Sequence, residues 1–154
     1  PFSIEFTNQF AQDLKFLSKS SLGSVLLATS RRTSKEMERA LLHNIPNPKH
    51  ISLWGDDNIN HYLTYLALAD VIIVTGDSIT MCSEACASNK PVYIYLPPYL
   101  KDTKYEKFSL ELFEAGYARP FIGKIEKWQS NKLCTEIILA KIIKNKLFSS
   151  DFVS

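Results

Sequence analysis

Two short polar segments carry the side chains of this 154-residue chain that are best suited to bind an anion. Arginine guanidinium groups hold phosphate oxygens in a bidentate fashion, and serine and threonine hydroxyls add hydrogen-bond donors. The candidate residues are Ser30, Arg31, Arg32 and Thr33 in the first segment and Gly76, Asp77, Ser78 and Thr80 in the second. These residue types predict a site for a phosphate or diphosphate group.

The second segment precedes a stretch, residues 78–88, that has the composition of a helix. The first N–H groups of a helix lack partners within the helix and carry partial positive charge, so they can hold a phosphate. Asp77 or Ser78 suits the N-cap, Ser78 and Thr80 supply hydroxyls, and Gly76 would let a ligand approach the backbone. Asp77 would repel phosphate unless it caps inward. The alternative is an ordinary strand-to-helix turn with a good cap.

The two arginines and one carboxylate complete the predicted site. Adjacent loop residues seldom point the same way, so we expect one of Arg31 and Arg32 to face the ligand. The other would form an ion pair, with Glu36 or Asp77 as the partner. Glu84 lies further along the helix, where its carboxylate could accept hydrogen bonds from ribose hydroxyls. The alternative for Glu84 is a solvated helix residue.

Cysteine and histidine do not indicate a metal site. Cys82 and Cys86 stand four residues apart on the predicted helix, and Cys134 is distant in the sequence. His61 is the nearest histidine, and no second pair completes a tetrahedral set. We therefore expect no metal and no cofactor, and we interpret the two cysteines as small core residues. The odd cysteine count favours a reducing compartment. We assign Trp54 and Trp128 to packing.

Strands alternating with helices must position these residues. We expect strands at 24–29, 51–54, 71–74, 92–96 and 119–122, and helices at 8–19, 34–43, about 59–69, 78–88, 105–115 and 131–147. The third helix would bear Ile59, Tyr62, Leu63, Leu66 and Ala69. This pattern predicts an α/β fold, a Rossmann-like three-layer domain with a mostly parallel five-stranded sheet. The strand order 2-1-3-4-5 would bring both polar segments to the switch-point crevice where such sheets bind ligands.

The amino-acid composition limits the classes of protein to which this chain can belong. Hydrophobic residues make up 45% and charged residues 22%, and the net charge of +2 does not indicate nucleic acid or an anionic membrane as a partner. No apolar run approaches the roughly 20 residues of a membrane helix. We therefore expect a cytoplasmic protein that is not transmembrane, which leaves peripheral membrane contact open. The chain begins at Pro1 within a helix pattern, so we expect a single domain that is the C-terminal half of a longer two-domain protein.

These residues resemble the mitochondrial fission ELM family over residues 24–128. The resemblance rests on the SRRT segment at 30–33, Trp54, residues 62–70 and the VTGDS segment at 74–78 with the residues that follow it. That family is similar to GT-B glycosyltransferases, whose C-terminal Rossmann-like domain binds the nucleotide-sugar donor. The resemblance places Ser78, Ile79 and Thr80 near the donor phosphate or sugar and Glu84 near the ribose. The spacing from Thr80 to Glu84 is one residue longer than in the muramyl-type transferases.

Three functional hypotheses follow. The first is a nucleotide-sugar donor-binding domain, with a nucleotide diphosphate or nucleotide-sugar and its own N-terminal domain as partners. The resemblance implies that the N-terminal domain supplies the catalytic base, so this chain would not catalyse transfer alone. The second is a non-enzymatic adaptor of the fission type that uses an exposed apolar surface, with the helix at 131–147 as the candidate. The third, an NAD-type sugar epimerase, is disfavoured because the chain has no G-x-G-x-x-G segment and no Tyr-x-x-x-Lys pair.

Overall fold

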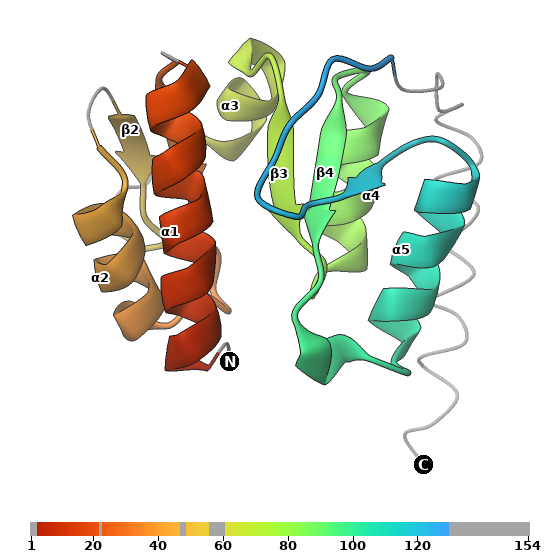
Figure 1. Ribbon diagram of the computed structural model, residues 1–154, viewed down its shortest axis with the longest axis horizontal. Helices are drawn as coiled ribbons and strands as arrows, with labels where there is room; N and C mark the ends of the chain where they lie inside the picture. The colour runs from red at the N-terminus through yellow and green to blue at the C-terminus, as the bar shows by residue number, and fades with distance from the viewer. Residues whose placement is uncertain (1–2, 22, 47–48, 56–60, 130–154) are drawn as a thin grey trace. The chain divides into compact units, whose positions relative to one another are not determined.

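The computed structural model describes residues 3–21, 23–46, 49–55 and 61–129 (Figure 1). These residues form two compact units. The first comprises the described residues up to Ala69 together with Ile122–Glu126, and the second comprises Asp70–Phe121 and the residues from Lys127 to Gln129. Each unit holds one of the two polar segments.

The first unit is a two-stranded parallel sheet with three helices. Its elements are α1 (Ile4–Ser21), β1 (Val25–Ala28), α2 (Lys35–Asn44), β2 (Lys49–Ser52) and α3 (Tyr62–Leu68). The strand register runs from Val25 opposite Lys49 to Ala28 opposite Ser52. Helices α1 and α2 lie side by side (Figure 1), and Gln12 of α1 donates to Asn44 of α2 at 3.2 Å. Their facing apolar residues form the core, which includes Phe10, Ala11, Met37, Leu41 and Ile45.

The second unit is a three-stranded parallel sheet of order β3-β4-β5. Its elements are β3 (Ile72–Thr75), α4 (Ile79–Ala87), β4 (Val92–Tyr95), the 3-10 turn η1 (Pro98–Leu100), α5 (Lys104–Glu114) and β5 (Arg119–Pro120). All four residues of the central strand β4 are buried, as a strand covered on both faces requires. Helix α5 ends where Gly116 adopts a φ of 73°, which lets the N–H of Tyr117 donate to Leu112 O at 2.9 Å.

The parallel α/β architecture is confirmed, with the strands in two sheets. The expected neighbours 2-1 and 3-4-5 are observed, whereas the single five-stranded sheet of order 2-1-3-4-5 is not confirmed. The second strand was expected at 51–54 but occupies Lys49–Ser52. The first two residues of β2, Lys49 and His50, are polar. Lys49 also caps the end of α2, because its ammonium group donates to Leu42 O at 2.7 Å and to Ile45 O at 2.8 Å.

The helix expected at about 59–69 is confirmed in its described part as α3, with Tyr62 and Leu66 half-buried. Helix α3 has no buried residue, and the side chain of Leu63 is 69% exposed. Ile59 and the helix expected at 131–147 lie outside the described residues. In the part of the chain that the structure describes, no helix has the length and apolar character needed to cross a bilayer.

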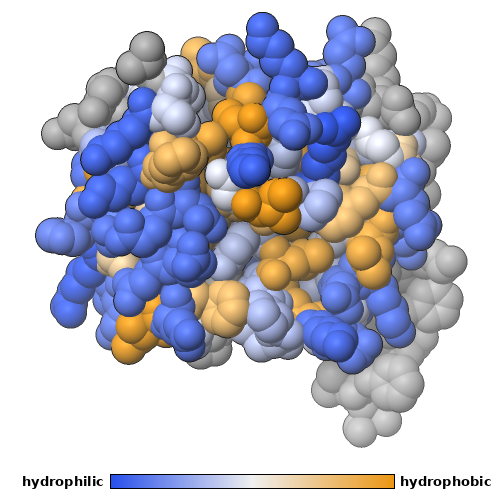
Figure 2. All heavy atoms as spheres, viewed as in Figure 1, coloured by the Kyte–Doolittle hydropathy of each residue, from blue (hydrophilic) through white to orange (hydrophobic). Residues whose placement is uncertain are grey.

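Exposed apolar side chains occur in both units. Figure 2 shows hydrophobic patches interrupting a largely hydrophilic face. The large exposed apolar residues among those described are Ile4, Phe16, Trp54, Leu63, Leu68, Tyr99, Leu110 and Ile122.

Candidate functional site

The loop that follows β1 is held in shape by its own hydroxyl groups. The N–H of Ser30 donates to Thr33 Oγ1 at 3.0 Å, and the N–H of Arg32 donates to Ser30 Oγ at 3.2 Å. Ser34 caps α2 by accepting a hydrogen bond from the N–H of Met37 at 3.1 Å. The short turn 30–33 therefore has a defined conformation, as small hydroxyl residues at a helix start favour.

Both arginines of this loop are exposed. In the described part of the chain, the Arg31 side chain has no hydrogen-bond or ion-pair partner, and the expected ion pair with Glu36 is not formed. Glu36 is instead an exposed residue in the first turn of α2, where a carboxylate interacts favourably with the helix dipole. Arg31 is thus a cation available to an anionic ligand.

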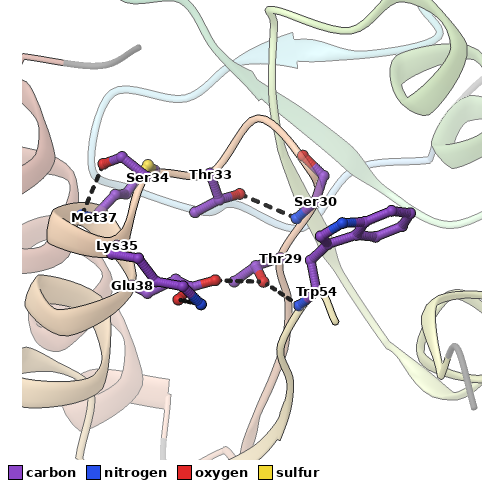
Figure 3. Close-up of polar contacts among 8 residues, drawn as sticks. All are labelled: Thr29, Ser30, Thr33, Ser34, Lys35, Met37, Glu38 and Trp54. Atoms are coloured by element: carbon purple, nitrogen blue, oxygen red, sulfur yellow. Dashed lines mark hydrogen bonds and ion pairs between the residues drawn. The ribbon is translucent and has the colours of Figure 1, made fainter. Parts of the chain in front are cut away.

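A buried carboxylate stands behind this loop (Figure 3). Glu38 is 4% exposed; its Oε1 accepts a hydrogen bond from the Thr29 hydroxyl at 3.2 Å, and its Oε2 accepts one from Lys35 Nζ at 2.7 Å. Thr29 Oγ1 also accepts a hydrogen bond from the backbone N–H of Trp54 at 2.8 Å. Both oxygens of this buried carboxylate are therefore partnered, as burial of a charge requires.

The assignment of Trp54 to packing is wrong. The side chain of Trp54 is 54% exposed, although its backbone N–H is anchored to Thr29. The expected packing role holds for Trp128, which lies edge-on to the Tyr93 ring at 6.2 Å and beneath the Arg119 guanidinium at 4.8 Å.

The turn between β3 and α4 has the predicted cap. Ser78 is the N-cap residue of α4, and its side chain accepts a hydrogen bond from the N–H of Met81 at 3.3 Å. In the described part of the chain, no partner is found for the backbone N–H groups of Ile79 and Thr80 or for the hydroxyl of the exposed Thr80. The first turn of α4 therefore keeps donors that an anion could accept.

Gly76 is explained by packing. A Cβ atom at this position would lie 2.5 Å from Leu96 Cδ2, 3.2 Å from Ile94 Cγ2 and 3.3 Å from Tyr95 O. The N–H of Gly76 donates to Tyr95 O at 2.9 Å, which extends the pairing of β3 with β4 by one residue. The close approach that requires glycine is thus to the neighbouring strand β4, whereas the sequence suggested an approach by a ligand.

Three groups of the second unit have altered acidity, and Asp77 contributes to two of the shifts. Burial, with the negative charge of Asp77 as a smaller cause, raises the pKa of Tyr99 to about 12. Burial also raises the pKa of the Cys82 thiol, with smaller contributions from Cys86 and Asp77, and raises the pKa of Cys86 to about 12. Both thiols are buried, which confirms their interpretation as core residues. Desolvated thiols of this kind are unreactive.

The remaining predicted site residues are placed as follows. Glu84 is half-buried on α4, and no hydrogen-bond partner of its carboxylate is found among the described residues. Ile79 is half-buried, as are Asp77 and Ser78. No group of three or more potential metal ligands occurs in residues 3–129 outside the gaps at 22, 47–48 and 56–60. Ser78, Ile79 and Thr80 lie together at the start of α4, and Ser30, Arg31 and Thr33 lie together after β1.

Comparison with known proteins gives the family. The family model described as "Mitochondrial fission ELM1" matches residues 1–147. The chain belongs to the mitochondrial fission ELM1 family. It is 33% identical over 101 residues to the "Mitochondrial fission protein ELM1" of Arabidopsis thaliana, covering 66% of this chain and 23% of that protein. It is also 33% identical over 152 residues to "Uncharacterized protein RP120" of Rickettsia prowazekii (strain Madrid E), covering 88% of this chain and 42% of that protein.

The chain thus spans less than half the length of both of these ELM1-family relatives. No solved structure matches it. Family membership confirms the resemblance inferred from the sequence motifs, and it leaves the ligand to be argued from the residues themselves.

Sequence reasoning missed two features of this ELM1-family chain. Glu38 looked like one of two acidic residues in the first turn of a helix, but only Glu36 is exposed there. The signal that separates them is helical spacing, since Glu38 lies next to Met37 and three residues before Leu41 on the buried face of α2. No comparable signal marks Trp54 as exposed, because it is an aromatic residue that follows Leu53 just after the end of β2.

Proposed function

We propose that this chain binds the diphosphate of a nucleotide-sugar, as the donor-binding domain of a GT-B-like glycosyltransferase. The observation that carries the proposal is the first turn of α4, where the N–H groups of Ile79 and Thr80 and the Thr80 hydroxyl have no partner in the described part of the chain. Three donors at the carboxyl end of a parallel strand suit the oxygens of a phosphate.

The Arg31 guanidinium supports the same ligand. It is an exposed cation on a loop whose backbone is fixed by Ser30 and Thr33, so little entropy is lost when it orders around an anion. A guanidinium group pairs with two phosphate oxygens at once. During glycosyl transfer, negative charge develops on the diphosphate leaving group, so such contacts would stabilise the transition state.

The fold is compatible with this role. In GT-B enzymes the donor lies at the carboxyl ends of parallel strands, where both polar segments of this chain follow β1 and β3. The single sheet of order 2-1-3-4-5 remains our proposal for how the strands are ordered. Under this proposal the catalytic base comes from an N-terminal domain, and Glu84 accepts hydrogen bonds from the ribose.

A thermal-shift panel tests the proposal directly. UDP, GDP, ADP, CMP, their sugar derivatives and NAD are each added to this chain and to the variant Arg31→Ala. Arg39→Ala is the matched control, because Arg39 is an exposed arginine of α2 outside the loop. A ligand at about 100 times its Kd should stabilise the fold by roughly 2.7 kcal/mol.

The proposal predicts stabilisation by one nucleoside diphosphate, reduced in Arg31→Ala and retained in Arg39→Ala. Equal shifts in both variants would exclude Arg31 from the site. No shift with any nucleotide would contradict the proposal and favour the adaptor hypothesis. Stabilisation by NAD alone would favour the epimerase.

A further inference from the structure

Trp54 combines an exposed ring with an anchored backbone. Its side chain is 54% exposed, while its N–H donates to Thr29 Oγ1 at 2.8 Å. Thr29 follows β1 directly and is itself tied to β2, because its own N–H donates to Ser52 O at 3.0 Å. The position of residue 54 is therefore set by the end of β1, twenty-five residues away in the sequence.

A buried carboxylate holds the anchor in place. The Thr29 hydroxyl donates to Oε1 of Glu38 at 3.2 Å, and Glu38 is only 4% exposed. Because Thr29 has one hydroxyl proton and gives it to Glu38, its oxygen lone pairs face the N–H of Trp54. Figure 3 shows that the indole extends away from Glu38, on the side where the chain continues to Ser30.

Thr29 is therefore linked both to the loop that carries Arg31 and to Trp54. It precedes Ser30 and Arg31 in the chain, and it holds Trp54 by hydrogen bonding. Arg31 is thus an exposed cation and Trp54 an exposed aromatic ring, and Thr29 links both to the end of β1. A diphosphate attached to a planar ring would satisfy both groups.

We propose that the Trp54 indole stacks on the nucleobase of a nucleoside diphosphate whose phosphates bind the loop at 30–32. This inference rests on the proposed function, and it adds the residue that recognises the base. Stacking on an aromatic side chain accepts any base, so Trp54 would contribute affinity for the ring while leaving the choice of base to other contacts. Loss of such stacking weakens binding by about tenfold or more.

The test separates the base from the diphosphate. UDP, ADP, GDP and inorganic pyrophosphate are titrated by calorimetry into the chain, Trp54→Ala, Trp54→Phe and the control Leu63→Ala, which also removes an exposed apolar side chain from the first unit. We expect Trp54→Ala to bind the nucleoside diphosphate about tenfold more weakly, with Trp54→Phe intermediate. Pyrophosphate should bind equally to all four proteins.

A second measurement does not require Trp54→Ala to fold. In the variant Trp128→Phe, Trp54 is the only tryptophan, so its fluorescence should be quenched by the nucleoside diphosphate and left unchanged by pyrophosphate. If pyrophosphate and the nucleoside diphosphate bind, but Trp54→Ala matches the unmodified chain, the stacking proposal is overturned and the proposed function stands. If neither probe binds, the proposed function fails and the stacking proposal with it.

Discussion

Gly76 and Leu96 are packed so closely that a Cβ atom at position 76 would lie 2.5 Å from Leu96 Cδ2. The same Cβ atom would lie 3.2 Å from Ile94 Cγ2 and 3.3 Å from Tyr95 O, which both belong to β4. The turn that carries Asp77 and Ser78 is therefore held tightly against the neighbouring strand.

Gly76→Ala should destabilise the fold by about 1–3 kcal/mol, because the added methyl group overpacks this contact. The measurement is urea unfolding followed by circular dichroism. Gly23→Ala is the control, since a Cβ there meets only Ser21 Oγ at 3.4 Å. Adding Leu96→Ala to Gly76→Ala should recover part of the loss; no recovery would show that the backbone at Tyr95, rather than Leu96, sets the limit.

Glu38→Ala should lower the free energy of unfolding by about 1–3 kcal/mol, because it leaves the half-buried Thr29 hydroxyl without its acceptor and removes the ion pair with Lys35. Glu36→Ala, in the same turn of α2 but exposed, should change it by less than about 0.5 kcal/mol. Chemical denaturation of both variants measures the difference. Equal effects would contradict the structural role assigned to Glu38.

The buried thiols predict a loss of stability in alkaline solution. The pKa of Cys86 is raised from 9.0 to about 12, so in the folded chain this thiol stays protonated where the unfolded chain ionises. The folded state therefore holds more protons above pH 9, and stability falls with rising pH by up to about 1.4 kcal/mol per pH unit for each such group. Below that pH the contribution is fully present.

Urea midpoints at pH 8 and pH 10 measure this fall. The variant Cys86→Ala should show a smaller fall between the two pH values than the unmodified chain. An identical fall in both proteins would show that Cys86 is not the group responsible. Cys82, whose pKa is also raised by burial, would then be the next candidate.

Short sequence patterns predicted the helix caps of this fold better than the burial of its side chains. The N-cap of α4 could be narrowed to Asp77 or Ser78, because capping depends on the residue itself and its immediate neighbours. The partner of the buried Glu38 and the anchoring of the Trp54 backbone could not be predicted, because both depend on the hydroxyl of Thr29, which is distant from them in the sequence. The start of β2 was missed for a related reason, since Lys49 is polar yet pairs with Val25 and caps α2.

Thr80→Val should weaken binding of the nucleoside diphosphate about tenfold while changing stability little, because the lost hydroxyl is exposed and the side-chain shape is kept. Thr64→Val, an exposed threonine of α3, is the matched control. Calorimetric titration with the nucleotide selected by the thermal-shift panel gives both affinities. Unchanged affinity in Thr80→Val would remove the first turn of α4 from the site.

The most direct test of the central claim is a calorimetric titration of the unmodified chain with the selected nucleoside diphosphate and with the matching nucleoside, which lacks the phosphates. Because the claim is that the chain holds the diphosphate, the nucleoside should bind at least about tenfold more weakly. Equal binding of the two compounds would show that the phosphates are not recognised. The absence of nucleoside diphosphate binding by the unmodified chain would contradict the account itself.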